Sequence, residues 1–231
     1  MAPTIVLITG ANRGLGEGII QRYLAKPDHI VIAANRNPGH ETSKALEDLP
    51  KGPGTRLIVV KIDARSDSDA TTAIKELKDQ GIDHLDIVIA NAAIIFPFVK
   101  IEDAKIADLR VSTETNIQGF FVLYQATLPL LLKSKRPTWI TIGSMAGSIV
   151  AAQHWLTKRI NAEEETICAF VISPGWVQTE GGNSSARMLG LKEAPQPLGS
   201  TCDGMVDVFD KASKESHGGK FLNWEGNDES W

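Results

Sequence analysis

The chain lacks the features that mark several classes of protein. It has only two cysteines, Cys168 and Cys202, too few for a disulfide framework. No block of lysine or arginine is present to follow a phosphate backbone, and the net charge is −4, which argues against nucleic acid as a partner. No apolar run approaches the roughly 18 residues of a membrane-spanning helix. We therefore expect a cytoplasmic protein without nucleic-acid or membrane partners.

The chain does have enough apolar material for one full core. Hydrophobic residues make up 42% of its 231 residues. No repeat, low-complexity tract or linker divides it, so residues 1–231 are expected to form a single domain. The one long irregular stretch is residues 181–201, which mix Gly, Ser, Asn and Pro with a short apolar piece. Such stretches in compact domains are lids or disordered loops, and we interpret this one as a substrate lid.

Apolar, β-branched runs alternate with amphipathic stretches along most of the chain. The expected strands are residues 4–9, 29–34, 56–63, 85–90, 138–143, 167–173 and 220–224. The expected helices are residues 16–25, 41–48, 67–79, 106–133, 155–165 and 204–214. This alternation predicts an α/β fold: one Rossmann-type doubly wound parallel sheet of about seven strands, with helices on both faces. Its ligand crevice would lie at the carboxyl ends of the strands.

The most informative motif follows the first expected strand. Residues 9–16 read Thr-Gly-Ala-Asn-Arg-Gly-Leu-Gly, between an apolar run and an amphipathic stretch. A strand, a glycine turn and a helix place a dinucleotide pyrophosphate on the helix N-terminus. An ordinary glycine-rich loop is the alternative interpretation. The spacing differs from the general Gly-x-Gly-x-x-Gly pattern and resembles that of the short-chain dehydrogenase/reductase family.

The residues after the second expected strand bear on the choice of cofactor. Arg36 stands where a carboxylate would bind the ribose hydroxyls of NAD, and a guanidinium suits the 2′-phosphate of NADP instead. Arg13, inside the glycine turn, would add a second positive contact. Two solvated surface arginines are the alternative. By resemblance to the family, Asp63 would face the adenine.

Later motifs also resemble the family, and they occur in its order. Residues 90–93, Ala-Asn-Ala-Ala, are similar to its Asn-Asn-Ala-Gly. Asn116 corresponds to the asparagine that bends a helix and holds a proton-relay water, with a plain polar surface residue as the alternative. Ser144 follows the fifth expected strand and corresponds to the catalytic serine, which donates to a substrate carbonyl. Residues 173–179 match the Pro-Gly motif, in which Val177 and Thr179 would meet the carboxamide and a nearby phosphate.

The resemblance thus implies two sets of site residues and no metal site. The catalytic set is Ser144 and Asn116. The cofactor-binding set is Gly10, Asn12, Arg13, Gly14, Leu15, Gly16, Arg36, Asp63, Asn91, Ala92, Pro174, Gly175, Val177 and Thr179.

One family motif is missing. Members need Tyr-x-x-x-Lys after the serine, because a phenol acid has its pKa lowered by the adjacent ammonium. The chain has only Tyr23 and Tyr124, in stretches expected to pack elsewhere. Residues 151–158 resemble the stretch that directly follows the motif in fungal norsolorinic-acid-ketoreductase-like members. The join would therefore fall between Val150 and Ala151, as a true deletion or as a loop absent from this sequence.

His154 and Lys158 restore an i, i+4 pair that contains a competent acid. Using this pair would turn the helix so that Trp155, Leu156 and Ile160 leave the core. We therefore interpret His154 and Lys158 as helix-surface residues.

The resemblance implies an NADPH-dependent carbonyl reductase or alcohol dehydrogenase. Its substrate would be a small ketone or alcohol of polyketide or aromatic character, and a homo-oligomer is left open. The competing hypothesis is a non-catalytic NADP-binding isoform, because the acid is missing from the chain as written.

Overall fold

The computed structural model of the protein describes residues 2–94, 101–144 and 148–230. These residues contain a seven-stranded sheet in the order β3-β2-β1-β4-β5-β6-β7, with every neighbouring pair parallel. Its strands are β1 Thr4–Thr9, β2 His29–Asn35, β3 Arg56–Lys61, β4 Ile87–Ala90, β5 Thr138–Ile142, β6 Cys168–Ser173 and β7 Phe221–Asn223. The order reverses between β1 and β4, where a doubly wound sheet opens its crevice. The predicted fold class is confirmed.

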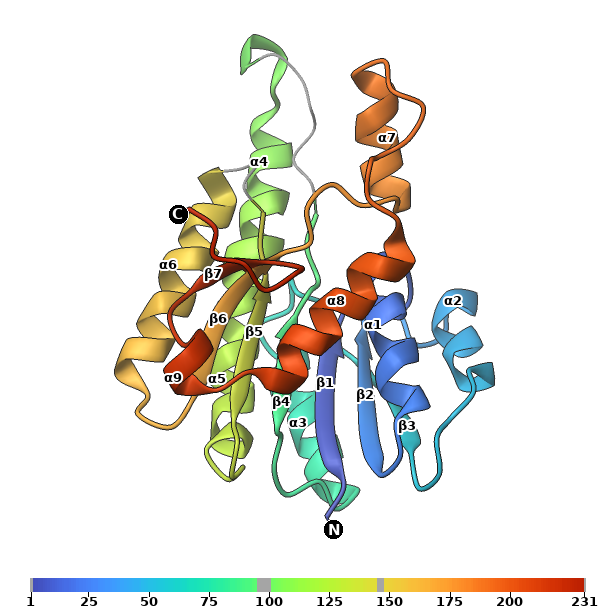
Figure 1. Cartoon of the computed structure of the whole chain (residues 1–231), viewed down its shortest axis with the longest axis vertical. Helices are drawn as coiled ribbons and strands as arrows, with labels where there is room; N and C mark the ends of the chain where they lie inside the picture. Colours follow the sequence, from blue (N-terminus) through green and yellow to red (C-terminus); the bar gives the residue numbers. More distant parts are fainter. Residues whose placement is uncertain (1, 95–100, 145–147, 231) are drawn as a thin grey trace.

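Helices cover both faces of the sheet (Figure 1). One face carries α1 Gly14–Ala25 and α8 Leu198–Lys211, and the other carries α3 Asp69–Asp79, α5 Gly119–Leu131 and α6 Ser148–Glu163. The remaining helical segments are α2 Glu41–Lys44, η1 Ala45–Asp48, η2 Ile101–Asp103, α4 Ile106–Thr113, η3 Glu114–Gln118, α7 Glu180–Met188 and α9 Lys214–His217. In Figure 1, α4 and α7 extend beyond the carboxyl edge of the sheet. Among the described residues, no helix is both long and apolar enough to cross a bilayer.

The two faces have separate hydrophobic cores. Along β1, Ile5 and Leu7 pack into the core beneath α3, α5 and α6, whereas Val6 and Ile8 pack into the core beneath α1 and α8. Successive side chains of a strand point to opposite faces, so a strand buried on both sides is apolar throughout. This is why the strands read as continuous apolar runs in the sequence.

Several expected helix boundaries were wrong. The helix expected at 204–214 begins at Leu198, because Thr201 and Cys202 are fully buried. A Cβ on Gly18 would lie 2.6 Å from the Cys202 sulfur, so small residues let α8 approach α1 closely. The stretch 106–133 divides into α4, the π-helical η3 and α5.

The stretch 181–201 is not irregular throughout. Residues 180–188 form α7, and α8 already begins at Leu198. The Thr179 hydroxyl caps α7 by accepting a hydrogen bond from the Gly182 N–H at 3.0 Å. The indole N–H of Trp176 also donates to the Gly182 carbonyl at 3.0 Å. This capping outweighs the low helix propensity of the glycines and serines that follow.

Candidate cofactor and active site

The glycine turn between β1 and α1 requires its glycines. Gly10 and Gly14 have φ angles of 63° and 57°, a region that other residues rarely adopt. A Cβ on Gly16 would lie 2.2 Å from the Gly10 carbonyl oxygen, and one on Gly10 would lie 3.1 Å from Cα of Ala92. Leu15 packs against the core beneath α1. The turn is therefore as tight as the sequence predicted.

The N-terminus of α1 opens directly from this turn. Arg13 precedes the twelve-residue helix and its side chain makes no capping hydrogen bond within the described chain. The first amide groups of a helix have no partner inside the helix, and together with the helix dipole they attract anions. The turn and the helix start thus fit the pyrophosphate of a dinucleotide.

Thr9 fastens the turn to β4, a role that the sequence analysis missed. Its hydroxyl accepts hydrogen bonds from the N–H groups of Asn91 at 3.1 Å and of Ala92 at 3.0 Å. In return, the Asn91 amide donates to the carbonyls of Thr9 at 2.8 Å and Gly10 at 3.1 Å. Asn91 and Ala92 therefore lie at the turn, as expected, and the Asn91 side chain helps to hold its shape.

Asn35 is a second residue that the sequence analysis missed. It ends β2, is 1% exposed, and accepts a hydrogen bond from the Ala11 N–H at 2.9 Å through its Oδ1. Its Nδ2 is buried and has no hydrogen-bond partner among the described residues. The signal that could have revealed it is an amide residue where a strand ends beside a glycine turn.

Three polar residues expected at the cofactor differ in whether their side chains already have a hydrogen-bond or ion-pair partner in the protein. Arg36 is exposed and makes no hydrogen bond or ion pair with any described residue. Arg13 pairs with Glu180 at 3.3 Å, with both side chains largely exposed. Asn12 donates to the Thr42 hydroxyl at 2.5 Å. Of the two arginines, Arg36 is thus the one with its guanidinium available to an anion.

Asp63 lies beyond β3, with its side chain 25% exposed. Its Oδ1 accepts a hydrogen bond from the Arg65 N–H at 3.0 Å, and its own N–H donates to Asp69 at 3.0 Å. The carboxylate thus stands at the carboxyl edge of the sheet, the edge at which the adenine contact was expected.

The segment after β6 lies beside the glycine turn. Pro174 follows β6 directly, and Gly175 has a φ of 72°. A Cβ there would lie 2.0 Å from the side-chain oxygen of Gln196, the residue that also bridges to buried Val177. The Thr179 side chain lies 3.6 Å from where a Cβ on Gly14 would stand. The fold therefore brings the first and last predicted cofactor motifs together.

Asn116 is not a surface residue. It is 6% exposed and lies within η3, where the helix widens to π geometry. Its amide accepts from the Ile94 N–H and donates to the Ile94 carbonyl, both at 2.9 Å. Three residues later, a Cβ on Gly119 would lie 2.3 Å from the Ala64 carbonyl oxygen. The irregular helix thus packs tightly against both the β3 and β4 ends of the crevice.

Ser144 is half-buried just beyond β5, and residues 145–147 lie outside the described part of the chain. α6 begins at Ser148 and runs unbroken through the expected join at Val150 and Ala151. Neither tyrosine is near: Tyr23 is buried in the α1 core, and the Tyr124 hydroxyl donates to Glu164 at 3.2 Å. Burial raises the pKa of both phenols. Tyr23 and Tyr124 therefore pack away from Ser144, as expected.

His154 is buried, so its assignment to the helix surface was wrong. It is 6% exposed, its ring lies 4.6 Å from that of Phe221, and a Cβ on Gly143 would lie 2.4 Å from its Nε2. Burial lowers the pKa of His154 to about 4. The imidazole is therefore uncharged at neutral pH and carries no acidic proton for a substrate.

The burial of the other residues of α6 agrees only in part with the sequence interpretation. Lys158 is exposed, as expected. Trp155 was expected in the core but is 57% exposed, with the Arg159 guanidinium 5.1 Å from its ring. Ile160 is buried and Leu156 packs against the core. No group of His, Cys, Asp and Glu that could hold a metal occurs among the described residues.

Known proteins that are similar to this chain share its fold and its glycine-turn region. The family profile described as short chain dehydrogenase matches residues 4–188. A norsolorinic acid ketoreductase of Dothistroma septosporum is 36% identical over 239 residues, covering 95% of this chain and 89% of the relative. The NADPH-bound carbonyl reductase from chicken fatty liver superposes with a TM-score of 0.87 at 26% identity, covering 100% of this chain and 95% of that one.

A second fungal relative is longer than this chain over the aligned region. The norsolorinic acid ketoreductase of Emericella nidulans is 33% identical, covering 99% of this chain and 94% of the relative. The alignment extends over 247 positions, 16 more than the 231 residues of this chain. The relative therefore carries at least this many residues that have no counterpart here.

Proposed function

This chain belongs to the short-chain dehydrogenase family, and we propose that it is an NADPH-dependent ketoreductase or carbonyl reductase. We propose as its substrate a ketone of polyketide or aromatic character. The fungal relatives are named for the reduction of norsolorinic acid, and the similar solved structure is an NADPH-bound carbonyl reductase.

The observation that carries the cofactor proposal is the position of Arg36. It follows β2 directly, next to the Asn35 amide that holds the glycine turn, and its guanidinium is exposed and uncommitted within the described chain. A guanidinium binds a phosphate through paired, charge-assisted hydrogen bonds. The 2′-phosphate of NADPH supplies such a group, and NADH does not.

A fluorescence titration tests this assignment. NADPH should bind at least ten times more tightly than NADH, since a hydrogen bond to a charged group contributes about 1.5–3 kcal/mol. Arg36→Asp should weaken NADPH specifically, and NADH should bind as tightly or more tightly, because a carboxylate at this position can accept hydrogen bonds from the ribose hydroxyls. The matched control is Arg56→Asp, which changes an exposed arginine at the amino end of β3, on the opposite edge of the sheet. Equal affinities of the parent protein for the two cofactors would remove Arg36 from the site.

The other site residues take roles that their positions support. The Ser144 hydroxyl would donate to the substrate carbonyl, and Asn116 would keep η3 and the Ile94 backbone in place beside it. Val177 and Thr179 would meet the carboxamide and a nearby phosphate, with Asp63 toward the adenine. NADPH, when bound, supplies the hydride. The exposed apolar side chains of Met188, Leu189 and Leu191 favour a lid that closes over an apolar substrate.

A second candidate function is NADPH binding without turnover. It is favoured by the fact that α6 begins four residues after Ser144 and that the chain has no tyrosine there. The Emericella relative has residues without a counterpart in this chain, and we place such a segment at the join between Val150 and Ala151. Loss of a general acid lowers the rate by about two to four orders of magnitude.

Turnover and mass separate the two candidates. The purified chain should bind NADPH yet reduce test ketones poorly, and insertion of about twenty residues containing Tyr-x-x-x-Lys after Val150 should restore turnover. Fast turnover by the uninserted chain would refute the second candidate. An intact mass of 25.0 kDa confirms the deletion in the protein. An excess of roughly 2 kDa would show that the segment is present.

A further inference from the structure

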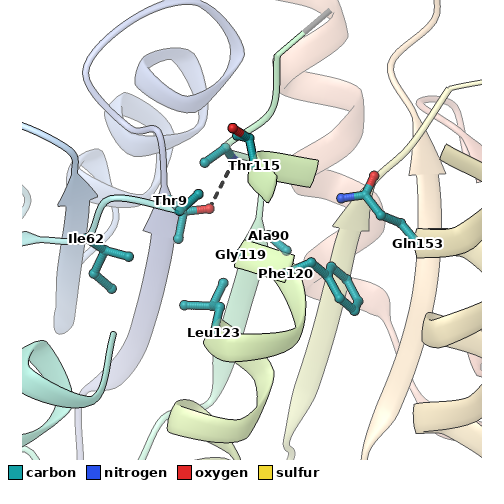
Figure 2. A pocket seen from close by; sticks show the side chains of 10 residues that line it. Thr9, Ile62, Ala90, Thr115, Gly119, Phe120, Leu123 and Gln153 are labelled. Carbon is teal, nitrogen blue, oxygen red and sulfur yellow. Dashed lines mark hydrogen bonds between the residues drawn. The ribbon is translucent and has the colours of Figure 1, made fainter. Parts of the chain in front are cut away.

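A groove between α3 and α5 is separate from the site described above. The cavity beside Thr9 and Ala90, at the carboxyl edge of the sheet, has a volume of only about 20 Å³ (Figure 2). The hollow between the two helices has a volume of about 400 Å³, within the roughly 300–1,000 Å³ of small-molecule sites. This α3–α5 groove is lined by residues that include Ile74, Lys75, Lys78, Val122, Ala126 and Pro129.

The groove arises because two helix faces meet without filling the space between them. Its lining residues on α3 are three or four positions apart, and Val122, Ala126 and Pro129 follow the same spacing on α5. Each set therefore shares one face of its helix. The side chains on the α5 face are short, so the space above the buried residues Ala70 and Ala73 stays open.

The floor of the groove is apolar. Ile74 is 4% exposed, and Val122 and Ala126 are half-buried against the core beneath α3 and α5. Covering such a floor with an apolar group removes further apolar surface from water, which is favourable.

One wall of the groove is positively charged. Lys75 and Lys78 are exposed, and neither makes a hydrogen bond or ion pair with any described residue. The only carboxylate among the described lining residues is Asp67, which precedes α3 at the end away from Lys78. The opposite wall carries the neutral side chain of Gln125. The groove therefore offers two ammonium groups to an anion, although the chain as a whole has a net charge of −4.

The size of the groove favours a small occupant. The lining of α3 runs from Thr71 to Lys78, which corresponds to about 10 Å along a helix. A stable protein–protein interface needs about 800 Å² on each partner, more than a groove of this length supplies. The complementary ligand is a single apolar chain that ends in an anionic group.

We infer that the α3–α5 groove binds a small amphiphilic carboxylate. Its apolar chain lies on Ile74, Val122 and Ala126, and its carboxylate lies between the ammonium groups of Lys75 and Lys78. This binding does not require NADPH, because the groove opens on the surface between two helices and not at the carboxyl edge of the sheet.

A titration of the full chain with decanoate tests the inference. The methyl NMR signals of Ile74, Val122 and Ala126 should shift, and calorimetry gives the affinity. Decanol keeps the apolar chain without the charge and should bind roughly 2- to 30-fold more weakly, the loss expected for two exposed ion pairs. Added salt should weaken decanoate and leave decanol unchanged or slightly tighter.

Substitutions separate the charged wall from the apolar floor. The double variant Lys75→Gln, Lys78→Gln should weaken decanoate by the same factor and leave decanol unchanged. The matched control Lys44→Gln, Lys192→Gln removes the same charge at exposed lysines elsewhere and should change neither affinity. Ala126→Gln fills the groove and should weaken both ligands. A melting curve shows whether Ala126→Gln folds, and the exposed lysine pair keeps the test decisive if it does not.

Four outcomes overturn the inference. The first is the absence of decanoate-induced shifts at Ile74, Val122 and Ala126 in the parent protein. The second is equal affinity of the parent for decanoate and decanol, which would show that the lysines do not hold the carboxylate. The third is loss of decanoate binding in the Lys44, Lys192 control alone, which would place the carboxylate elsewhere. The fourth is a dimer at high protein concentration that Ala126→Gln abolishes, which would show that a second copy of the chain fills the groove.

Discussion

The burial of His154 predicts that the stability of the protein falls between pH 7.5 and pH 5. Its imidazole packs between Gly143 and Phe221, and burial lowers its pKa from 6.5 to about 4. The His154 imidazole therefore takes up a proton near pH 6.5 in the unfolded chain, but only near pH 4 in the folded chain. Stability is fully present above the unfolded pKa and is lost as the pH falls toward the folded pKa.

The size of the effect follows from the shift. Each pKa unit corresponds to about 1.4 kcal/mol, so the complete loss is about 3 kcal/mol, of which about 2 kcal/mol falls between pH 7.5 and pH 5. Urea denaturation at these two pH values measures it directly. His217, whose pKa burial also lowers, contributes in the same direction, so the comparison must be made with a variant.

His154→Leu removes the titrating group. The difference in unfolding free energy between pH 7.5 and pH 5 should therefore be smaller by about 2 kcal/mol than in the parent protein. The matched control is His40→Leu, which changes an exposed histidine and leaves the buried imidazole in place. In this control, the unfolding free energy should depend on pH as it does in the parent protein. If His154→Leu keeps the parent slope, the imidazole is not buried as described, and a role for it as a proton donor would reopen.

Three further substitutions test the site and its supports. Gly16→Ala places a Cβ 2.2 Å from the Gly10 carbonyl oxygen; it should destabilise the fold by about 1–3 kcal/mol and abolish NADPH binding in a titration. Asn116→Leu removes both hydrogen bonds to the Ile94 backbone and should lower the unfolding free energy in urea by about 1–3 kcal/mol. An unchanged urea midpoint would show that these two hydrogen bonds do not stabilise the fold. Lys214→Met removes an ammonium that donates to the carbonyls of Asn161, Glu164 and Ile167 at the end of α6; calorimetry should show a lower melting temperature with cofactor affinity unchanged.

The sequence by itself determined the architecture and the positions of most residues that we propose to contact the cofactor. Glycine spacing, apolar runs and their alternation with amphipathic stretches are local signals, because they report backbone turns and periodicity within a few residues. β1 begins and ends as expected, and Gly10, Gly14 and Gly16 form a tight turn. The absence of a tyrosine after Ser144 is likewise a fact of the sequence alone.

The tertiary structure decided which side chains are buried and what they meet. The orientation of α6 is set by packing against β5, β6 and η3, which buries Gln153 and His154 and exposes Trp155, although residue type favours the opposite arrangement. Partners such as Thr9 with Asn91 lie 82 positions apart in the chain. Such contacts depend on strand order and helix rotation, which no short stretch of sequence specifies. For this reason the roles of Thr9 and Asn35 in holding the glycine turn could be recognised only from the tertiary structure.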